Sequence, residues 1–391
     1  MKEFVLEGGA VPNVKIDYEG ELNAEQLPVV QHGDGPTLVL AGAGSGKTRT
    51  ITYRVAWLLE HGVAPDRIML LTFTNKAAKE MIVRIEALLK SYPHGVWAGT
   101  FHSVANRLLR KYGKSTGYGH NFTILDEEDA NDLMKLCIKE LKIDTKAKRF
   151  PSPGVMRGIR SYCVNSRRPL AEVIEERHEH FLPLQGEIEA VIARFAAAKL
   201  EQQSMDFDDL LVVLLELLQN NAEVRASLAQ QFEYVLVDEF QDTNVIQADI
   251  VDALSSVHRN VLVVGDDAQS IYSFRAAQIK NILEFPTRYP GAKMFRLVTN
   301  YRSTPEILDV ANAVIANNAD QFKKDLVAVV KHGEKPYLVP AADGPQEAQY
   351  VVEQILELNE GMPLRQMAVL FRAAFHSQAL EFELMKRGIL Y

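Results

Sequence analysis

A glycine-rich loop between a short apolar run and a helical stretch constrains the fold of this chain more than any other feature. The apolar run covers residues 37–41, the loop reads Gly-Ala-Gly-Ser-Gly-Lys-Thr over residues 42–48, and the helical stretch continues to about residue 60. Glycines let backbone N–H groups turn inward on a phosphate group, and the start of the following helix favours negative charge there. Strand, loop and helix in this order therefore predict an α/β fold whose loop binds phosphate.

The alternation of strand and helix continues on both sides of a long interruption. A second apolar run at residues 68–73 precedes a helical segment at 76–90, and strand-like runs return at 234–237 and 261–264. Such alternation implies a parallel sheet covered by helices. Residues 111–205 read as helices and loops, so we expect a helical insert within the α/β domain.

A third unit is expected to begin near residue 293. It contains a strand-like segment at 296–298, a helix over 304–318 and a second strand-like run at 367–371. The chain stops at residues 388–391, where a helix has ended and we expect a new strand to start. Because an unpaired parallel edge would be left there, we expect a chain cut from a longer one.

Composition is ordinary for a globular protein, with 47% hydrophobic and 24% charged residues. No apolar run approaches the ~18 residues of a membrane helix, and the first residues do not form a secretory signal. Cys137 and Cys163 have no metal-ligand spacing, and a disulfide between them cannot be argued. We expect a cytoplasmic protein with no membrane partner.

The net charge of −8 argues mildly against a nucleic-acid partner, because affinity for DNA comes largely from basic side chains. Residues 142–168 form a local exception, with eight basic side chains against Asp144, or +8 − 1 = +7. A solvated basic surface and a contact for the nucleic-acid backbone both remain open for this stretch.

A second acidic motif completes a candidate nucleotide site. The apolar run 234–237 ends in Asp238 and Glu239. With the upstream loop, this pattern predicts phosphoryl transfer to water: Lys47 reaches the β- and γ-phosphates, Thr48 and Asp238 hold Mg²⁺, and Glu239 polarises the attacking water. Taken alone, the loop could be a glycine-rich turn, and many strands end in acids.

Further segments in the same order resemble superfamily 1 DNA helicases of the UvrD/Rep/PcrA type, and the resemblance covers the chain from about residue 22 to residue 391. This family implies a RecA-like P-loop NTPase sheet with a helical insert, plus the start of a second RecA-like domain. Departures are Ala41 for the first loop glycine, Phe240 for the common tyrosine and Phe274 for a frequent tryptophan. The matching segments are 22–26, 71–81, 99–103, 238–242, 264–277 and 300–303.

The resemblance assigns roles around ATP. Gln26 would contact the adenine base and Tyr301 would stack on it, while Gln269 would sense the γ-phosphate and Arg302 would approach it. Other residues expected at the nucleotide are Ala43, Gly44, Ser45, Gly46 and Arg49.

The resemblance also places a row of residues against single-stranded DNA. Aromatic platforms hold single strands without sequence preference, at about 1–3 kcal/mol per base, which reconciles an acidic chain with a DNA partner. Any one of these aromatic residues alone is more often a core residue, and His102 alone is more often structural. The expected DNA contacts are Phe73, Thr100, His102, Tyr272, Phe274 and Arg275.

The resemblance divides the chain into an N-terminal extension, a first motor domain in two pieces, a helical insert and an incomplete second motor domain. Nothing after Arg302 matches the family's last arginine-bearing motif; Arg372 and Arg387 lack its surroundings. We therefore expect a truncated chain that binds nucleotide weakly and hydrolyses it poorly. The expected ranges are 1–20, then 21–110 with 206–292, then 111–205, and 293–391.

The leading interpretation is an ATP-dependent helicase and translocase, 3′-to-5′ by resemblance, acting on single-stranded DNA and duplex junctions. The alternative is a nucleotide-dependent DNA-binding module without motor activity. A phosphate-loop ATPase acting on protein or small molecules is a third interpretation. The cellular pathway, protein partners and oligomeric state are left open by the sequence.

Overall fold

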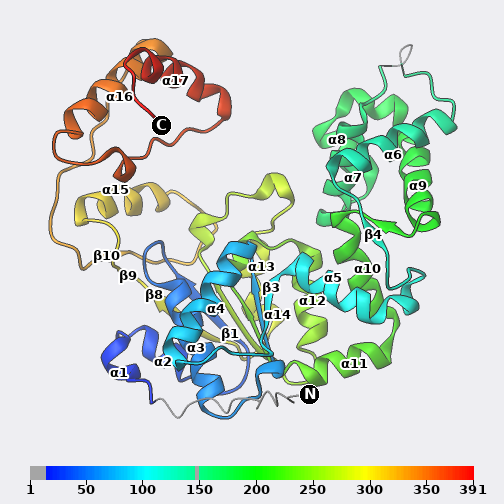
Figure 1. Cartoon of the computed structure of the whole chain (residues 1–391), viewed down its shortest axis with the longest axis horizontal. Coiled ribbons are helices and arrows are strands. Elements are labelled where there is room, and N and C mark those ends of the chain that lie inside the picture. The colour runs from blue at the N-terminus through cyan, green and yellow to red at the C-terminus, as the bar shows by residue number, and fades with distance from the viewer. Residues whose placement is uncertain (1–14, 146–148) are drawn as a thin grey trace, which may run out of the picture. The chain divides into compact units, whose positions relative to one another are not determined.

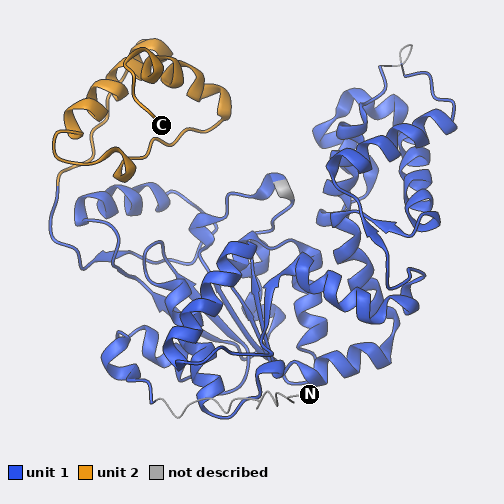
Figure 2. Ribbon diagram, in the orientation of Figure 1, with its two compact units in different colours: residues 1–333 blue, residues 334–391 orange. Residues whose placement is uncertain are grey.

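The computed structural model describes residues 15–145 and 149–391, apart from the side chain of Arg275. Its contacts divide the chain into two compact units, one ending at Gly333 and one covering Glu334–Tyr391 (Figure 2). The candidate site lies entirely in the first unit.

A six-stranded sheet forms the centre of the first unit, with helices on both faces (Figure 1). Every pairing in it is parallel. Buried apolar runs such as the one before the glycine loop favour this arrangement, because strands of a parallel sheet are covered on both sides. The predicted α/β fold is therefore confirmed. In sheet order the strands are β3 (Trp97–Thr100), β2 (Ile68–Thr72), β6 (Tyr234–Val237), β7 (Asn260–Gly265), β1 (Thr37–Ala41) and β8 (Lys293–Leu297).

Alternate residues of the inner strands supply two separate cores. On β1, Leu38 and Leu40 belong to one core, whereas Val39 and Ala41 belong to the other. Both faces of the sheet are thus covered by apolar side chains of the helices. The first core includes residues of α5 (Phe101–Tyr112), α10 (Phe207–Asn220), α11 (Ala222–Gln231), α12 (Val245–Leu254), α13 (Lys280–Leu283) and α14 (Phe285–Arg288). The second includes residues of α2 (Gln26–Val30), α3 (Lys47–Glu60) and α4 (Asn75–Leu89).

Hydroxyl caps fix the helices that begin at the carboxyl edge of the sheet. The Thr74 side chain accepts a hydrogen bond from Ala77 N at the start of α4, and Thr100 accepts one from Ser103 N at the start of α5. Such caps satisfy N–H groups that a helix start leaves unpaired. The loops after β2 and β3 are therefore held in place, and with them the side chains that face the site.

The insert is a helical bundle with its own core, which includes Met134 and Phe195. Where the chain enters and leaves it, β4 (Thr123–Ile124) pairs with β5 (Ser204–Met205) in parallel, a pairing the sequence did not predict. The domain boundaries as a whole stay a prediction. The bundle consists of α6 (Glu127–Glu140), α7 (Pro153–Ser166), α8 (Leu170–Arg177) and α9 (Gln185–Glu201).

The last strand of the sheet comes from the segment that we assigned to the next domain. Lys293 of β8 pairs with Thr37 of β1, so residue 293 belongs to the strand at one edge of this sheet. The first unit then continues to Gly333 through β9 (Thr299–Asn300), α15 (Pro305–Ile315) and β10 (Val327–Ala328).

The second unit is built on α16 (Gly344–Leu358) and α17 (Ser377–Lys386), which pack on each other. The strand predicted at residues 367–371 is wrong, because no strand forms there and Leu370 is 94% exposed. An apolar run becomes a strand only where a neighbour accepts its backbone hydrogen bonds, and the described residues of this unit contain no other strand. In the described parts of the chain, no helix has both the length and the apolar character to cross a bilayer.

Candidate functional site

The phosphate loop needs glycine at two positions for steric reasons. Gly44 has a φ of 69° and Gly46 a φ of 86°, in the left-handed region that side chains disfavour. A Cβ atom on Gly44 would also lie 2.7 Å from the Cβ atom of Arg302. Gly46 is the N-cap of α3, so the loop passes directly into the helix that carries Lys47 and Thr48. This is the strand, loop and helix setting that the sequence predicted.

The lysine and the acidic pair meet at the carboxyl edge of the sheet. Lys47 is 9% exposed, and its Nζ atom lies 2.9 Å from Oε2 of Glu239. Asp238 follows β6, where its N–H donates to the Leu71 carbonyl of β2. Glu239 has a φ of 50°, an uncommon conformation for a residue with a side chain, and such residues cluster at functional sites.

Negative charge at this edge exceeds the positive charge available from Lys47. Burial and the neighbouring Glu239 raise the pKa of Asp238 to about 7, although Lys47 lowers it. Burial and Glu239 also raise the pKa of Asp242 to about 6. We name Lys47, Asp238, Glu239 and Asp242 the acid edge; it would gain from a further cation.

The acid edge fits a magnesium ion. Among the described residues, the buried Oδ1 atoms of Asp238 and Asp242 have no hydrogen-bond partner. Thr48 and Asp238 line the same cavity of about 520 Å³, which also includes Gln269. Hydroxyl and carboxylate oxygens are the ligands that Mg²⁺ prefers.

Gln269 reaches this cavity from the loop after β7. Its side-chain amide donates to Oδ2 of Asp266 at 2.7 Å. The structure therefore brings Gln269 together with Thr48, Asp238 and Glu239, as the sequence predicted.

Residues assigned to the adenine base also converge on the loop. Gln26 is buried, and its amide donates to the Ser45 carbonyl at 3.0 Å. Tyr301 donates its backbone N–H to the Gly44 carbonyl, and its hydroxyl accepts a hydrogen bond from Asn23 at 2.7 Å. Tyr301 is half exposed, so its ring has a free area beside the loop.

Arg302 and Arg49, both predicted to contact the nucleotide, have different neighbours in the structure. The Arg302 side chain is exposed next to Gly44, within reach of the loop. Arg49 instead pairs with Glu21 at 2.6 Å and donates to the Tyr53 hydroxyl. Arg49 thus bonds the N-terminal segment in this structure, and its role at the nucleotide stays a prediction.

The structure adds Asn300, whose role the sequence did not reveal. Its side-chain amide donates to the Ala43 carbonyl at 2.6 Å, and its Oδ1 atom accepts the N–H groups of Arg302 and Ser303. Asn300 is 1% exposed. An asparagine that begins a turn was a possible signal, since its side chain commonly bonds the backbone two residues on. Asn300 therefore fixes Tyr301 and Arg302 against the phosphate loop.

A second cavity of about 610 Å³ adjoins the first and is lined by aromatic rings. The rings of Phe73 and Tyr272 have centroids 5.2 Å apart, and those of Tyr272 and Phe274 are 5.8 Å apart. Phe73 is 38% exposed and Phe274 59%. These rings form a row of the kind that the predicted contact with single-stranded DNA requires. The predicted contact at the Arg275 side chain lies outside the described residues.

Thr100 and His102 line the same cavity as the rings. Burial lowers the pKa of His102, although Asp208 raises it, so the imidazole is neutral at pH 7. His102 therefore offers a hydrogen-bonding ring to the cavity and not a cation.

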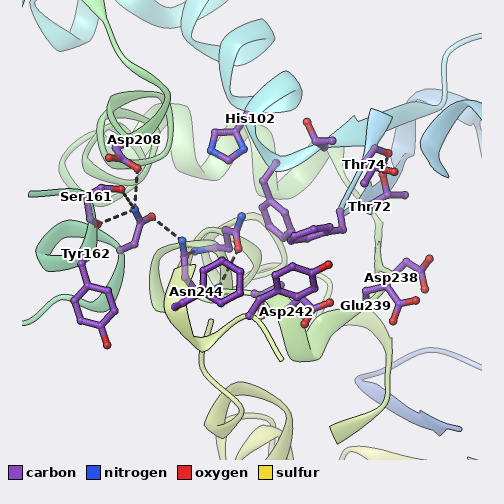
Figure 3. A pocket seen from close by; sticks show the side chains of 18 of the residues that line it. Thr72, Thr74, His102, Ser161, Tyr162, Asp208, Asp238, Glu239, Asp242 and Asn244 are labelled. Carbon is purple, nitrogen blue, oxygen red and sulfur yellow. Dashed lines mark hydrogen bonds between the residues drawn. The ribbon is translucent and has the colours of Figure 1, made fainter. Parts of the chain in front are cut away.

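The far wall of this cavity comes from α7 of the insert and from the start of α10. Figure 3 shows Asp208 and Ser161 on one side of the cavity, with Asp238 and Glu239 on the other. The amide of Asn165 donates to Asp208 at 2.7 Å and accepts from Asn244, also at 2.7 Å. The sequence did not single out this network, because its members come from three separate helices or helix starts.

We name the aromatic-lined cavity of about 610 Å³ the groove. Phe207 is a further exposed ring beside it. It is 57% exposed and makes an edge contact with His102, at 6.0 Å between centroids. The sequence signal for an exposed ring at this position was a phenylalanine within the acidic segment Met-Asp-Phe-Asp-Asp.

The basic stretch at 142–168 is largely neutralised by the protein itself. Arg160 is buried against Asp206 and Asp209, at 3.0 and 2.6 Å, so it is not a DNA contact. Arg167 pairs with Asp249, and Arg168 pairs with Glu172 and Glu176. Residues 146–148 lie outside the described residues. Arg160, Arg167 and Arg168 thus pair within the protein, and a contact of the remaining basic residues with the nucleic-acid backbone stays a prediction.

The two cavities share one wall. Phe73, Asp238, Glu239, Asp242 and Tyr272 line both of them. The acid edge and the row of rings are therefore adjacent.

Comparison with known proteins identifies relatives of both parts of the chain. The UvrD/REP helicase N-terminal domain matches residues 22–290, and the UvrD-like helicase C-terminal domain matches residues 295–391. The chain is 39% identical over 374 residues to the ATP-dependent DNA helicase PcrA of Leuconostoc citreum, with 95% of this chain and 49% of the relative covered. It is 37% and 38% identical over 372 residues to the proteins of that name from Staphylococcus aureus and Staphylococcus epidermidis, with 95% of this chain and 50% of each relative covered.

The chain spans about half the length of the curated relatives it matches. The N-terminal match includes both cavities and most of the residues around them. The match is wide enough to decide the family, and the chain belongs to the UvrD/REP helicases.

Proposed function

We propose that this chain is the part of an ATP-dependent DNA helicase that binds ATP and grips single-stranded DNA, with 3′-to-5′ movement and action at duplex junctions. The observation that carries the proposal is the shared wall of Phe73, Asp238, Glu239, Asp242 and Tyr272 between the two cavities. A change of charge at the acid edge acts on side chains that also line the groove. The relatives are named ATP-dependent DNA helicases, which agrees with this proposal.

The residues around the loop suit hydrolysis of a magnesium-bound triphosphate. Thr48 and Asp238 would hold the ion, which supplies positive charge to the phosphates. Lys47 neutralises the β- and γ-phosphates, and Arg302 approaches from the other side. Glu239 then orients the attacking water and accepts its proton, since the ion pair with Lys47 already points its carboxylate toward the loop.

Gln26 and Tyr301 define the base end of the site. The Tyr301 hydroxyl bond to Asn23 holds its ring beside the segment that carries Gln26. The adenine ring would stack on Tyr301, while Gln26 would exchange its bond to the Ser45 carbonyl for one to the base.

In the groove, Phe73, Tyr272 and Phe274 would stack on successive bases, and Thr100 and His102 would contact the strand. Each stacked base contributes about 1–3 kcal/mol, a range independent of base identity. A sequence-tolerant grip of this kind is what movement along a strand requires.

Turnover with and without single-stranded DNA tests the proposal. We expect the 391-residue chain to bind a labelled oligonucleotide and to hydrolyse ATP slowly, because nothing after Arg302 matches the family's last arginine-bearing motif. DNA should raise the rate. The Phe274→Ala variant should weaken oligonucleotide binding by about 5- to 150-fold, the equivalent of 1–3 kcal/mol, and Val83→Ala serves as a matched control because Val83 is exposed outside the groove.

Binding of both ligands without any turnover would replace the proposal with a nucleotide-dependent DNA-binding module. Loss of oligonucleotide binding altogether would point to a phosphate-loop ATPase with another substrate. Rapid DNA-stimulated turnover by this chain would contradict the expected slow rate and keep the helicase assignment.

A further inference from the structure

A buried lysine outside the nucleotide and DNA motifs contacts the loop that carries Gln269. Lys324 lies between α15 and β10, and its side chain is 5% exposed. Its Nζ atom is 2.9 Å from Oδ1 of Asp266 and also contacts Oδ1 of Asp267. The backbone N–H of Phe322 donates to the other Asp267 oxygen at 3.0 Å. Two points of one short segment therefore bind the same acidic turn.

Asp266 connects Lys324 to the nucleotide site. Its Oδ2 atom accepts the Gln269 amide at 2.7 Å, and its N–H donates to Oε1 of Gln241 at 3.0 Å. The other end of Gln241 donates to Oε2 of Glu239 at 2.9 Å. Since Glu239 pairs with Lys47, an unbroken chain of polar contacts leads from the phosphate-loop lysine to Lys324.

The segment that carries Lys324 is also fixed against the phosphate loop. Asn312 of α15 exchanges two hydrogen bonds with the backbone of Leu326, each at 3.1 Å. A Cβ atom on Gly42 would lie 2.1 Å from a methyl group of Leu326, so this side chain packs directly on the loop. The segment thus contacts the loop and the Gln269 turn at once.

We propose that Lys324 is a positioning residue that couples nucleotide occupancy to the DNA groove, by holding Asp266 and Asp267 and through them Gln269 and Tyr272. The proposal rests on the proposed function. Without Lys324, two buried carboxylates would lose their cation, a costly state that the turn relieves by rearranging. Tyr272 follows Gln269 by three residues, so the same rearrangement reaches the row of rings.

The test measures coupling and not only binding. Fluorescence anisotropy gives the Kd of a labelled single-stranded oligonucleotide with and without Mg²⁺ and a non-hydrolysable ATP analogue, and the ratio of the two values is the coupling factor. Typical coupling factors are about 5–150, and linkage requires the same factor for the effect of DNA on the nucleotide. We expect the unchanged chain to show a factor in this range.

In Lys324→Met the coupling factor should fall to about 1, a loss of at least about fivefold on that scale. The Kd of each ligand measured alone should stay within about twofold, because Lys324 faces neither of the two cavities. Lys323→Met is the matched control, since Lys323 is the exposed neighbour, and it should keep the coupling factor of the unchanged chain.

A Lys324→Met protein that keeps its coupling factor overturns the proposal. So does one in which both separate affinities fall together, because that result shows a general structural defect. If Lys324→Met does not fold, the double variant Lys324→Met with Asp267→Asn removes one charge of each sign and tests the same point; full coupling in that folded protein contradicts the proposal.

Failure of the proposed function is recognised separately in the unchanged chain. If that chain binds no oligonucleotide, or binds it with no effect of the nucleotide, the proposed function fails and the role of Lys324 fails with it. If the unchanged chain is coupled and the variant is equally coupled, only the role of Lys324 is overturned.

Discussion

Two charge clusters in the first unit differ in how fully their carboxylates are paired with cations. The acid edge places Lys47 among Asp238, Glu239 and Asp242, and the pKa values of Asp238 and Asp242 are raised by burial and by Glu239. The second cluster, which we name the insert cluster, consists of Arg160, Lys199, Asp206 and Asp209. Here two cations pair with the two buried carboxylates, and Arg160 also lies 3.7 Å from the partly exposed Asp208.

The buried carboxylates of the insert cluster have cation and hydrogen-bond partners, whereas those of the acid edge have too few. Burial would raise the pKa of Asp206, but Arg160 and Lys199 outweigh it and lower the pKa. Asp206 and Asp209 also cap α10 by bonding each other's backbone N–H groups. At the acid edge, by contrast, the buried Oδ1 of Asp238 has no hydrogen-bond partner among the described residues.

This difference separates structure from function. A buried ion cluster whose carboxylates all pair with cations and whose hydrogen bonds are filled fixes a joint, in this case between α7, α9 and α10. A cluster with excess negative charge and an unbonded oxygen costs stability unless a cation binds. The acid edge is therefore held ready for a ligand, whereas the insert cluster needs none.

The largest expected effect comes from a charge removed at the acid edge. Glu239→Gln should lower ATP turnover by about 10²–10⁴-fold, since it removes the proposed proton acceptor. Its free energy of unfolding should change by no more than about 1 kcal/mol, because the lost ion pair with Lys47 is offset by relief of repulsion with Asp238 and Asp242. Steady-state phosphate release and urea unfolding measure the two quantities.

Glu233→Gln is the control for this variant, because Glu233 pairs with Arg67 away from both cavities. It should leave turnover unchanged. Turnover within threefold of the unchanged chain in Glu239→Gln would remove Glu239 from the reaction and leave the acid edge without a proton acceptor.

A charge removed from the insert cluster should lower the stability of the protein and leave its nucleotide affinity unchanged. Lys199 is 1% exposed and pairs with both Asp206 and Asp209. Lys199→Met should lower the free energy of unfolding by about 3–5 kcal/mol, because it leaves buried carboxylates with one cation too few. Nucleotide affinity of the folded protein should not change. Urea unfolding and a nucleotide titration at low denaturant check both statements.

Lys135→Met provides the comparison for an exposed pair. Lys135 lies 3.4 Å from Asp132 with most of its side chain in solvent, so its loss should cost less than about 1 kcal/mol. If Lys199→Met costs no more than Lys135→Met, the insert cluster does not stabilise the joint and the contrast between the clusters fails.

Much of the fold and of the site followed from local sequence. The runs before Gly42 and Asp238 are apolar except for Thr37, which suits a strand covered on both faces, and β1 and β6 have the predicted ends. Because parallel strands present their carboxyl ends at one edge, Lys47 and Asp238 had to meet once the sheet formed. The phosphate loop and the acidic pair were predictable for that reason.

What could not be predicted depends on partners far along the chain. Arg160 was one of eight basic residues in its stretch, and its burial follows from Asp206, 46 positions away. Lys324 contacts Asp267 across 57 positions, with no local pattern that marks it. The run at residues 367–371 has strand composition, yet a strand needs a neighbour that composition does not supply.

The smallest expected effect is a pH dependence at His102, which lies in the cavity between the two clusters. Burial lowers the pKa of His102 below its usual 6.5, while Asp208 of α10 opposes the shift. As pH falls below about 6.5, the unfolded chain takes up a proton before the folded chain does, so His102 makes the folded state progressively less stable until the lowered pKa is reached. Above about pH 7.5, one unit above the unfolded pKa, both states are almost entirely neutral and His102 contributes no pH dependence.

Urea unfolding of the unchanged chain and of His102→Gln, at steps from pH 8 to pH 5, isolates this contribution as a difference between two curves. The difference should be constant above about pH 7.5, and the unchanged chain should lose stability relative to the variant below it. If the unchanged chain instead gains relative stability as pH falls, Asp208 dominates and raises the pKa of His102. The groove would then resemble the insert cluster, where paired charge outweighs burial, and a cationic His102 would contact DNA phosphate and not a base.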